Sequence, residues 1–177
     1  SGVQFEWREP DLFGQKEIVL SDGRGKLYRI GVKNEPRPHL AALSEASLVR
    51  PLVSPVAVVE KVAYAVDGEG TLLAFQLPDL TRGEKWSLGG NCLWGPRRVG
   101  RRAMLTTEDQ LYCLDGSQKL LWKAPLPAGP LAGLPLESGN TCLLAAAGGL
   151  IWRVDAATGK ELARIQIGQP LASGPVL

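Results

Sequence analysis

Several residues that commonly carry enzyme chemistry are scarce in this 177-residue sequence. His39 is the single histidine, which excludes metal sites built from several histidines and leaves one residue for any Ser-His-Asp triad. The three cysteines, Cys92, Cys113 and Cys142, form no CxxC pair, which excludes zinc ribbons and thioredoxin-like motifs. Because their number is odd, at least one thiol is free or pairs between chains.

Charge of one sign and long apolar runs are also lacking. Lys plus Arg total 20 against 18 acidic residues, so the net charge of +2 creates no strong field for nucleic acid or membranes. No run approaches the roughly 18 apolar residues that a membrane-spanning helix requires. With 45% hydrophobic and 21% charged residues, the chain has the composition of an ordinary globular protein.

Turn residues are abundant, with 21 glycines and 13 prolines spread along the chain. They divide it into short segments, none of which carries a clean helical stripe longer than two turns. The best helix candidate is 40–48, and this segment is also consistent with a strand. Short β-branched and aromatic runs alternate with turn residues at roughly ten-residue spacing, which predicts an all-β sandwich, barrel or propeller.

Two sequence landmarks recur with a common period of roughly forty residues, which indicates stacked units. A proline comes early in each unit, at Pro10, Pro55, Pro96, Pro135 and Pro175. A residue pair closes the third predicted strand of each unit, at Arg29-Ile30, Ala74-Phe75, Cys113-Leu114 and Arg153-Val154. Each unit contains four short predicted strands, which is typical of one blade of a β-propeller.

The predicted fold is therefore all-β, a propeller of four-stranded blades with four blades in this chain. The blades are expected at about residues 3–48, 50–88, 91–126 and 130–167, with the start of a further strand at 169–177, all within one domain, 1–177. Four blades suggest two alternatives. Either they close a tight ring, or two chains form a homodimer that completes an eight-bladed ring.

Segments 111–122 and 151–162 resemble the quinoprotein-type propeller repeat. The family pattern is a tyrosine-bearing strand, an Asp, a Thr-Gly turn and a strand ending in Trp. The best-preserved positions are Asp115, Trp122, Asp155, Thr158 and Gly159. The third unit has the Trp without Thr-Gly, and the fourth has Thr-Gly without the Trp. The family includes pyrroloquinoline-quinone dehydrogenases and cofactor-free propellers of the outer-membrane assembly lipoprotein type, and the chain is closer to the latter branch.

These motif residues are interpreted as structural. A carboxylate at Asp115 or Asp155 can accept backbone N–H groups of the turn that follows, and Gly159 can supply a positive φ. A Trp on the outer strand can pack between blades and donate its indole N–H. The segments Asp22–Gly25 and Asp67–Gly70 lack the alternating carboxylates of a calcium loop and are interpreted as hairpin turns.

The densest charge on the chain is the segment PRRVGRR, on a predicted hairpin between the first and second strands of the third unit. Its arginines, Arg97, Arg98, Arg101 and Arg102, are candidates for contact with an anion or a partner. The alternative is a solvated hairpin tip. Without interleaved aromatic residues, the cluster is no platform for single-stranded nucleic acid.

The sequence thus predicts a non-enzymatic binding or scaffold module that engages a protein partner. No catalytic, cofactor-binding or metal-ligating residues are assigned, and neither a cofactor nor nucleic acid is expected. The alternatives are a fragment of a quinone-dependent dehydrogenase, or the propeller domain of a larger signalling or envelope protein. The family resemblance alone favours a bacterial cell envelope or periplasmic location.

Overall fold

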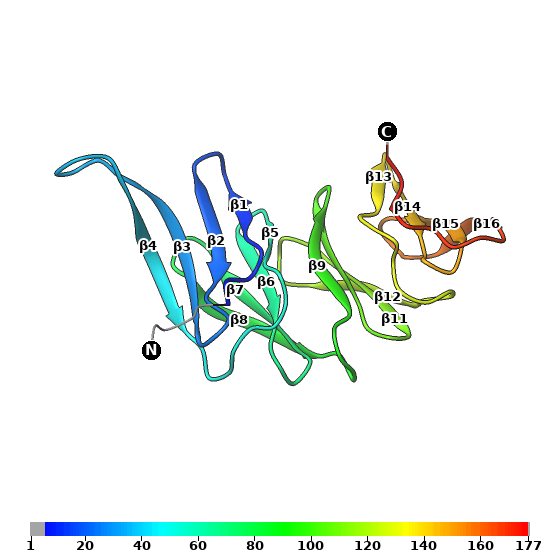
Figure 1. Cartoon of the computed structure of the whole chain (residues 1–177), viewed down its shortest axis with the longest axis horizontal. Coiled ribbons are helices and arrows are strands. Elements are labelled where there is room, and N and C mark those ends of the chain that lie inside the picture. The colour runs from blue at the N-terminus through cyan, green and yellow to red at the C-terminus, as the bar shows by residue number, and fades with distance from the viewer. Residues whose placement is uncertain (1–5, 177) are drawn as a thin grey trace.

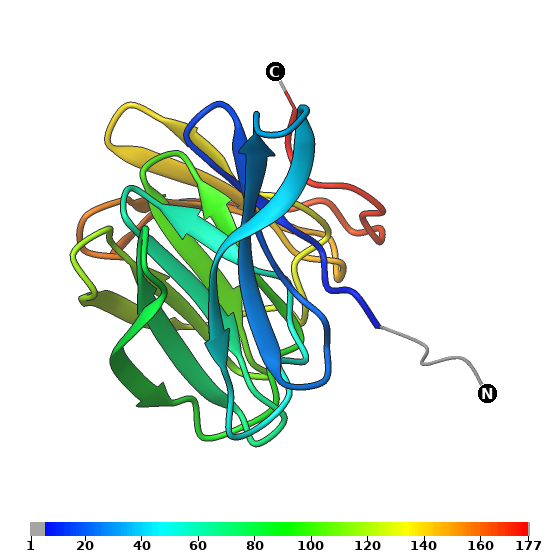
Figure 2. The same cartoon turned by 90° about the vertical axis from the view of Figure 1, so that its left-hand side faces the viewer.

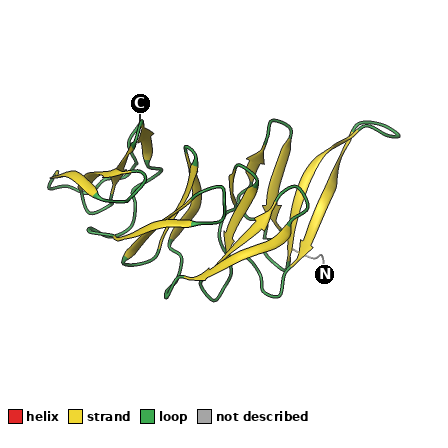
Figure 3. Cartoon of the chain, turned by 180° about the vertical axis from the view of Figure 1, so that it is seen from behind, coloured by secondary structure: helices red, strands yellow, loops and turns green. Residues whose placement is uncertain are grey.

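Four antiparallel sheets of four strands make up this computed structural model, which describes residues 6–176. Strands joined by loops account for the architecture, and no helix occurs among the described residues (Figure 3). Accordingly, nothing in this part of the chain forms a helix that could cross a membrane. The predicted all-β fold with four four-stranded blades is confirmed.

Within every sheet, strands that follow one another in the chain are hydrogen-bonded neighbours. The first sheet contains β1 (Asp11–Phe13), β2 (Glu17–Ser21), β3 (Lys26–Lys33) and β4 (His39–Ser47). The second contains β5 (Ala57–Val59), β6 (Val62–Val66), β7 (Thr71–Gln76) and β8 (Thr81–Ser87). The third contains β9 (Trp94–Val99), β10 (Arg102–Thr106), β11 (Gln110–Leu114) and β12 (Leu120–Pro125). The fourth contains β13 (Leu136–Ser138), β14 (Thr141–Ala145), β15 (Leu150–Asp155) and β16 (Glu161–Gln166).

The turn between the second and third strands is closed by side chain and backbone together. In the first sheet, Asp22 Oδ1 accepts the backbone N–H groups of Arg24, Gly25 and Lys26 at 2.9, 3.0 and 3.0 Å. Burial by itself raises the pKa of Asp22, but these hydrogen bonds outweigh it and hold the pKa below its ordinary value of 3.8. The carboxylate is therefore committed to its own turn.

One backbone hydrogen bond recurs in all four sheets and ties each outer strand to this turn. A residue that follows the fourth strand donates its N–H to a carbonyl of the turn. The four bonds are Leu48 to Gly25 (2.8 Å), Leu88 to Gly70 (3.0 Å), Leu126 to Asp109 (2.8 Å) and Ile167 to Gly149 (2.9 Å). The predicted period of roughly forty residues thus corresponds to a repeated structural unit.

The core consists of three apolar clusters, each lying between two neighbouring sheets. The first and second sheets enclose a cluster that includes Val19 and Phe75. The second and third sheets bury Tyr64 with Leu114, and the third and fourth bury Trp122 with Trp152. Because each sheet needs a neighbour to cover its apolar face, no sheet is an independent folding unit.

The four sheets are arranged in an open arc, in the order of the chain. The first and fourth sheets lie at opposite ends of the molecule (Figure 1), and none of the three buried clusters joins them. Viewed from the end in Figure 2, the first sheet lies in front with no other element covering it. Of the two alternatives left by the sequence, the tight four-bladed ring is not formed.

Two segments that the sequence left uncertain have clear structures. Residues 40–48, the best helix candidate, lie almost entirely in strand β4. Residues 169–176, expected to begin a further strand, form none. Leu171 N instead donates to Ala147 O at 3.0 Å, so this backbone is hydrogen-bonded to a turn of the fourth sheet rather than to a further strand. The outermost expected positions, 3–5 and 177, lie outside the described residues.

Candidate functional site

The arginine cluster begins in β9, at the inner edge of the arc, where β5 contacts both β1 and β9. Arg97 and Arg98 belong to β9 and reach back to the first sheet, past the second. Arg97 forms a two-pronged ion pair with Glu9, and Arg98 Nη2 lies 3.7 Å from Asp11 Oδ1. These carboxylates precede the arginines by more than eighty residues, so no local sequence pattern could reveal the pairing.

The other two arginines of the cluster contact the remaining sheets. Arg101 Nη2 lies 3.7 Å from Glu60 Oε1 in the second sheet, and Arg102 pairs with Glu137 in the fourth. The Arg102 and Glu137 side chains are about one-fifth exposed, whereas Arg101 extends into solvent. All four guanidinium groups therefore face carboxylates, which link the third sheet to each of the other sheets. Contact with an external anion or partner through this cluster stays a prediction.

The two motif aspartates close the hairpins between the third and fourth strands. Asp115 Oδ1 accepts the N–H groups of Ser117 (2.8 Å) and Lys119 (3.1 Å). Burial raises the pKa of Asp115, but hydrogen bonds led by that from the Ser117 hydroxyl lower it overall. Asp155 Oδ1 accepts the hydroxyl and the N–H of Thr158 at 2.8 and 2.9 Å, and these bonds lower its pKa.

Trp122 joins the third sheet to the fourth at the second of these hairpins. Its indole Nε1 donates to Ala156 O at 3.0 Å, and the side chain is buried within the apolar cluster. The ring lies so close to Gly159 that a Cβ on that residue would be 2.5 Å from it, and Gly159 also has a φ of +70°. The motif residues of two successive units thus form a single contact between sheets.

These residues do not fit a quinone site. The oxygens of Asp115 and Asp155 accept hydrogen bonds within their own turns, and the Trp122 ring is packed between two sheets. Within residues 6–176, no group of three His, Cys, Asp or Glu side chains is arranged to hold a metal ion. No chemical step through a quinone is therefore assigned to this chain.

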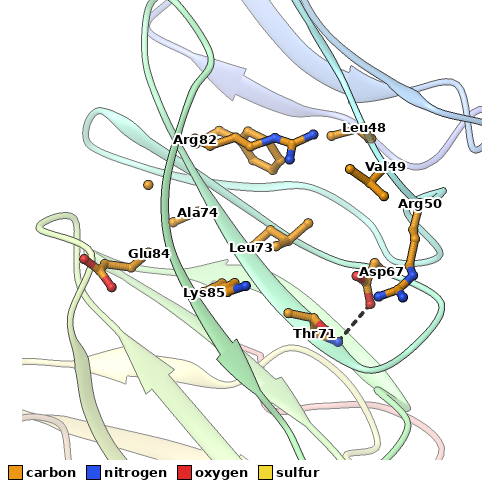
Figure 4. Close-up of a pocket in the computed structure, with 12 residues that line it drawn as sticks. Leu48, Val49, Arg50, Asp67, Thr71, Leu73, Ala74, Arg82, Glu84 and Lys85 are labelled. Carbon is orange, nitrogen blue, oxygen red and sulfur yellow. Dashed lines mark hydrogen bonds between the residues drawn. The ribbon is translucent and has the colours of Figure 1, made fainter.

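A groove that the sequence did not indicate lies between the first and second sheets (Figure 4). Its volume is about 360 Å³, and its walls come from the chain after β4 and from β7 and β8. Leu48, Val49 and Leu73 provide apolar surface, and Arg50, Arg82 and Lys85 provide positive charge. Of the lining residues, only the pair Ala74-Phe75 is a repeated landmark, and it marks a strand rather than a groove, so sequence reasoning had no signal for the groove.

Most charged groups around the groove are already engaged within the chain. Arg50 Nη1 lies 2.6 Å from Glu69 Oε2, and Arg82 Nη2 donates to Ser47 O at 2.8 Å. The dashed line in Figure 4 is the bond from Thr71 N to Asp67 Oδ1, at 2.9 Å. Neither Arg82, which bonds to a backbone carbonyl, nor Lys85 has an ion-pair partner among the described residues. The groove therefore keeps two cations that no carboxylate neutralises, Arg82 and Lys85, beside an apolar floor.

All three cysteines are free thiols, so none of them forms a disulfide within this chain. Burial raises the pKa of Cys113 to about 12 and the pKa values of Cys92 and Cys142 to about 11. We expect Cys113 and Cys142 to react negligibly with an aromatic disulfide reagent at pH 8 in the native protein, and all three thiols to react in urea. Rapid native labelling of either buried thiol would contradict this expectation.

Four-stranded antiparallel sheets stacked face to face define a β-propeller. A family model described as outer membrane protein assembly factor BamB matches residues 84–170. Together with the solved structures described next, this match identifies the chain as a PQQ-like repeat β-propeller that resembles BamB. Among curated proteins, no sequence matches significantly.

Solved structures share the fold at low sequence identity. BamB from Moraxella catarrhalis is 15% identical with a TM-score of 0.67, and the match covers 90% of this chain and 48% of that one. Apo AztD from Citrobacter koseri is 14% identical with a TM-score of 0.69, covering 96% and 49%. The computationally designed Ika8 protein is 13% identical with a TM-score of 0.66, covering 92% and 50%. The chain thus spans about half the length of these propellers.

Proposed function

We propose that the chain is a non-enzymatic protein-interaction module that binds an extended, acidic segment of a partner protein in the groove between its first and second sheets. The observation that carries the proposal is the groove itself, where apolar side chains lie beside two cations without carboxylate partners at a sheet edge. The propeller fold supports this role, because propellers use grooves and loops around a rigid scaffold for binding.

Strand β8 supplies the means of holding an extended segment. It pairs only with β7. Glu84 N–H of β8 already donates to Gln118 Oε1 at 2.8 Å, and the other backbone groups along its outer edge are available to a further strand. Arg82 and Lys85 are paired in register with Phe75 and Leu73, which places all four side chains on the groove side of the sheet. Because alternate side chains of an added strand face the same way, they would enter the groove.

The charges of β8 indicate the chemistry of that segment. Acidic side chains on the added strand would lie next to Lys85, and apolar side chains would cover Leu73 and Val49. The expected ligand is therefore an extended peptide in which acidic and apolar residues share one face.

A displayed library of eight-residue peptides tests the proposal. We expect selection of acidic-apolar sequences, and roughly tenfold weaker binding of the selected peptide to Lys85→Glu, since one close charge pair is worth on the order of 1.4 kcal/mol. Lys123→Glu makes the same charge change on the exposed outer strand of the third sheet and should leave the affinity unchanged. Failure to select any peptide, or equal weakening by both variants, would overturn the groove as the site.

A separate measurement addresses the dehydrogenase alternative. Pyrroloquinoline quinone and Ca²⁺ are added to the chain, which is then dialysed and assayed for dye reduction with simple alcohols. We expect neither retained chromophore nor dye reduction. Retention of the quinone together with alcohol-dependent dye reduction would show that the chain is an enzyme rather than an interaction module.

A further inference from the structure

The first sheet has an apolar outer face that no other sheet covers. Register places Leu12, Ile18, Ile30 and Ala42 in one row across all four strands, on the face opposite Val19. Val19 is fully buried against the second sheet, whereas Leu12 on the outer face is 49% exposed. An apolar row that crosses a complete sheet is costly to leave in water and marks a docking surface.

The fourth sheet has a corresponding face at the other end of the arc. Ala145, Ile151 and Ile165 are paired in one row across three strands, and Leu143 adjoins them on the same face. Ile165 is 61% exposed. The opposite face of this sheet carries Trp152, which is buried against the third sheet. Both ends of the arc therefore have one covered and one uncovered apolar face.

The repeat shows which kind of face each end presents. In the repeat, Tyr28 and Ile30 of the first sheet are equivalent to Tyr112 and Leu114 of the third sheet. Tyr112 and Leu114 are buried against the preceding sheet, which is the second. The first sheet thus has the residues that pack on a preceding sheet, although none precedes it among the described residues. In the same way, Ile151 has the position of Leu111, which is buried against the following sheet.

Arg153 also indicates that the outer face of the fourth sheet packs on a following sheet, in this case through a polar contact. It has the position of Arg29, which lies within strand β3 of the first sheet. Arg29 Nε donates to Pro78 O, in the β7–β8 hairpin of the following sheet, at 2.8 Å. Arg153 lies on the outer face of the fourth sheet, in register with Leu143 and Ala163. It is placed to make the same contact with the hairpin of a sheet that follows.

We propose that a second copy of this chain covers both end faces, so that two arcs related by a two-fold axis form one closed ring of eight sheets. The fourth sheet of each copy packs on the first sheet of the other, and Arg153 donates to the 34–38 hairpin of the partner copy. A second copy fits because the first sheet has the residues that pack on a preceding sheet, and the fourth sheet has those that pack on a following sheet. The two end faces can therefore pack on each other as neighbouring sheets do within the chain. Each copy contributes four sheets, so two copies supply the eight sheets of the ring.

Sedimentation equilibrium of the 177-residue chain gives the first test. We expect a mass of twice the 19.0 kDa of one chain at micromolar concentration, with no larger species. A series of masses that grows with concentration would indicate an open filament, which the same two faces could form without a two-fold axis. Growth of that kind, or a monomer at tens of micromolar, would overturn the proposal.

Two substitutions locate the contact. Ile30→Asp and Ile151→Lys each place an unpaired charge in both interfaces of the ring. We expect each to weaken dimerisation on the order of a hundredfold or more and to give a monomer with an unchanged circular dichroism spectrum. Val53→Asp changes a residue that is 48% exposed and lies in neither end face, and it should remain dimeric.

Mixing the two monomeric variants distinguishes this arrangement from others. In the mixed pair, one interface is unmodified and the other places the introduced aspartate of one copy beside the introduced lysine of the other, so we expect the dimer to return. The equivalent mixture containing Ile30→Lys and Ile151→Lys should stay monomeric. If Ile151→Lys alone stayed dimeric, the first sheets would be packing on each other and the proposed ring would be wrong.

Discussion

Replacement of Trp122 by Ala is expected to lower the free energy of unfolding by about 3–5 kcal/mol, the range for removing a large buried aromatic side chain. The indole fills the cluster between the third and fourth sheets and donates to Ala156 O. The variant therefore loses packing and leaves a buried carbonyl without its donor. Urea unfolding followed by circular dichroism at a fixed protein concentration measures the change.

Trp122→Phe serves as the matched control. It retains most of the ring volume but removes the indole N–H, so it should cost clearly less than the alanine variant. A loss below about 1 kcal/mol for Trp122→Ala, the range of an ordinary surface substitution, would show that the ring does not hold the two sheets together.

Gly159→Ala should be nearly as damaging, with an expected loss of about 2–5 kcal/mol. The left-handed φ of +70° costs an alanine about 1–2 kcal/mol, and forcing a methyl group to 2.5 Å from the Trp122 ring adds about 1–3 kcal/mol of overpacking. The same urea measurement applies. A loss limited to the backbone cost would mean that the ring moves aside freely.

Gly168→Ala separates the two contributions. Gly168 has a φ of +76°, but a Cβ there would meet nothing within 4 Å, so this variant should show the backbone cost alone. The double variant Trp122→Ala/Gly159→Ala supplies the converse control. With the ring gone, the added methyl has no ring to meet, and the two losses should be less than additive.

The sequence allowed prediction of the repeat because each unit marks its own strands and turns. Pro96 and the pair Cys113-Leu114 are the third unit's copies of the two landmarks that recur in every unit. The turns beside them are determined by residues that are close in the sequence. Asp22 and Asp155 each hydrogen-bond to residues within four positions along the chain. Contacts of such short range can be inferred from spacing alone, so the four sheets were predictable.

The candidate site was much less predictable, because its partners come from distant parts of the chain. Arg97 is paired with Glu9 and Arg102 with Glu137, and no period or motif connects these positions. The groove likewise combines the residues after β4 with β8 of the next sheet. The expected strand at 169–177 illustrates the same difficulty, since a strand exists only where another strand is available to pair with it.

The ion pairs of Arg97 and Arg98 change how the arc responds when it is disturbed. A stack in which each unit touches only its neighbours behaves as a one-dimensional array that frays from both ends. Here two arginines of the third sheet also hold Glu9 and Asp11 at the start of the first sheet, past an intervening unit. That second-neighbour coupling protects the first sheet from fraying. In a single arc that has not dimerised, the fourth sheet lacks such a link among the described residues and becomes the weakest unit, the one whose amide protons exchange first.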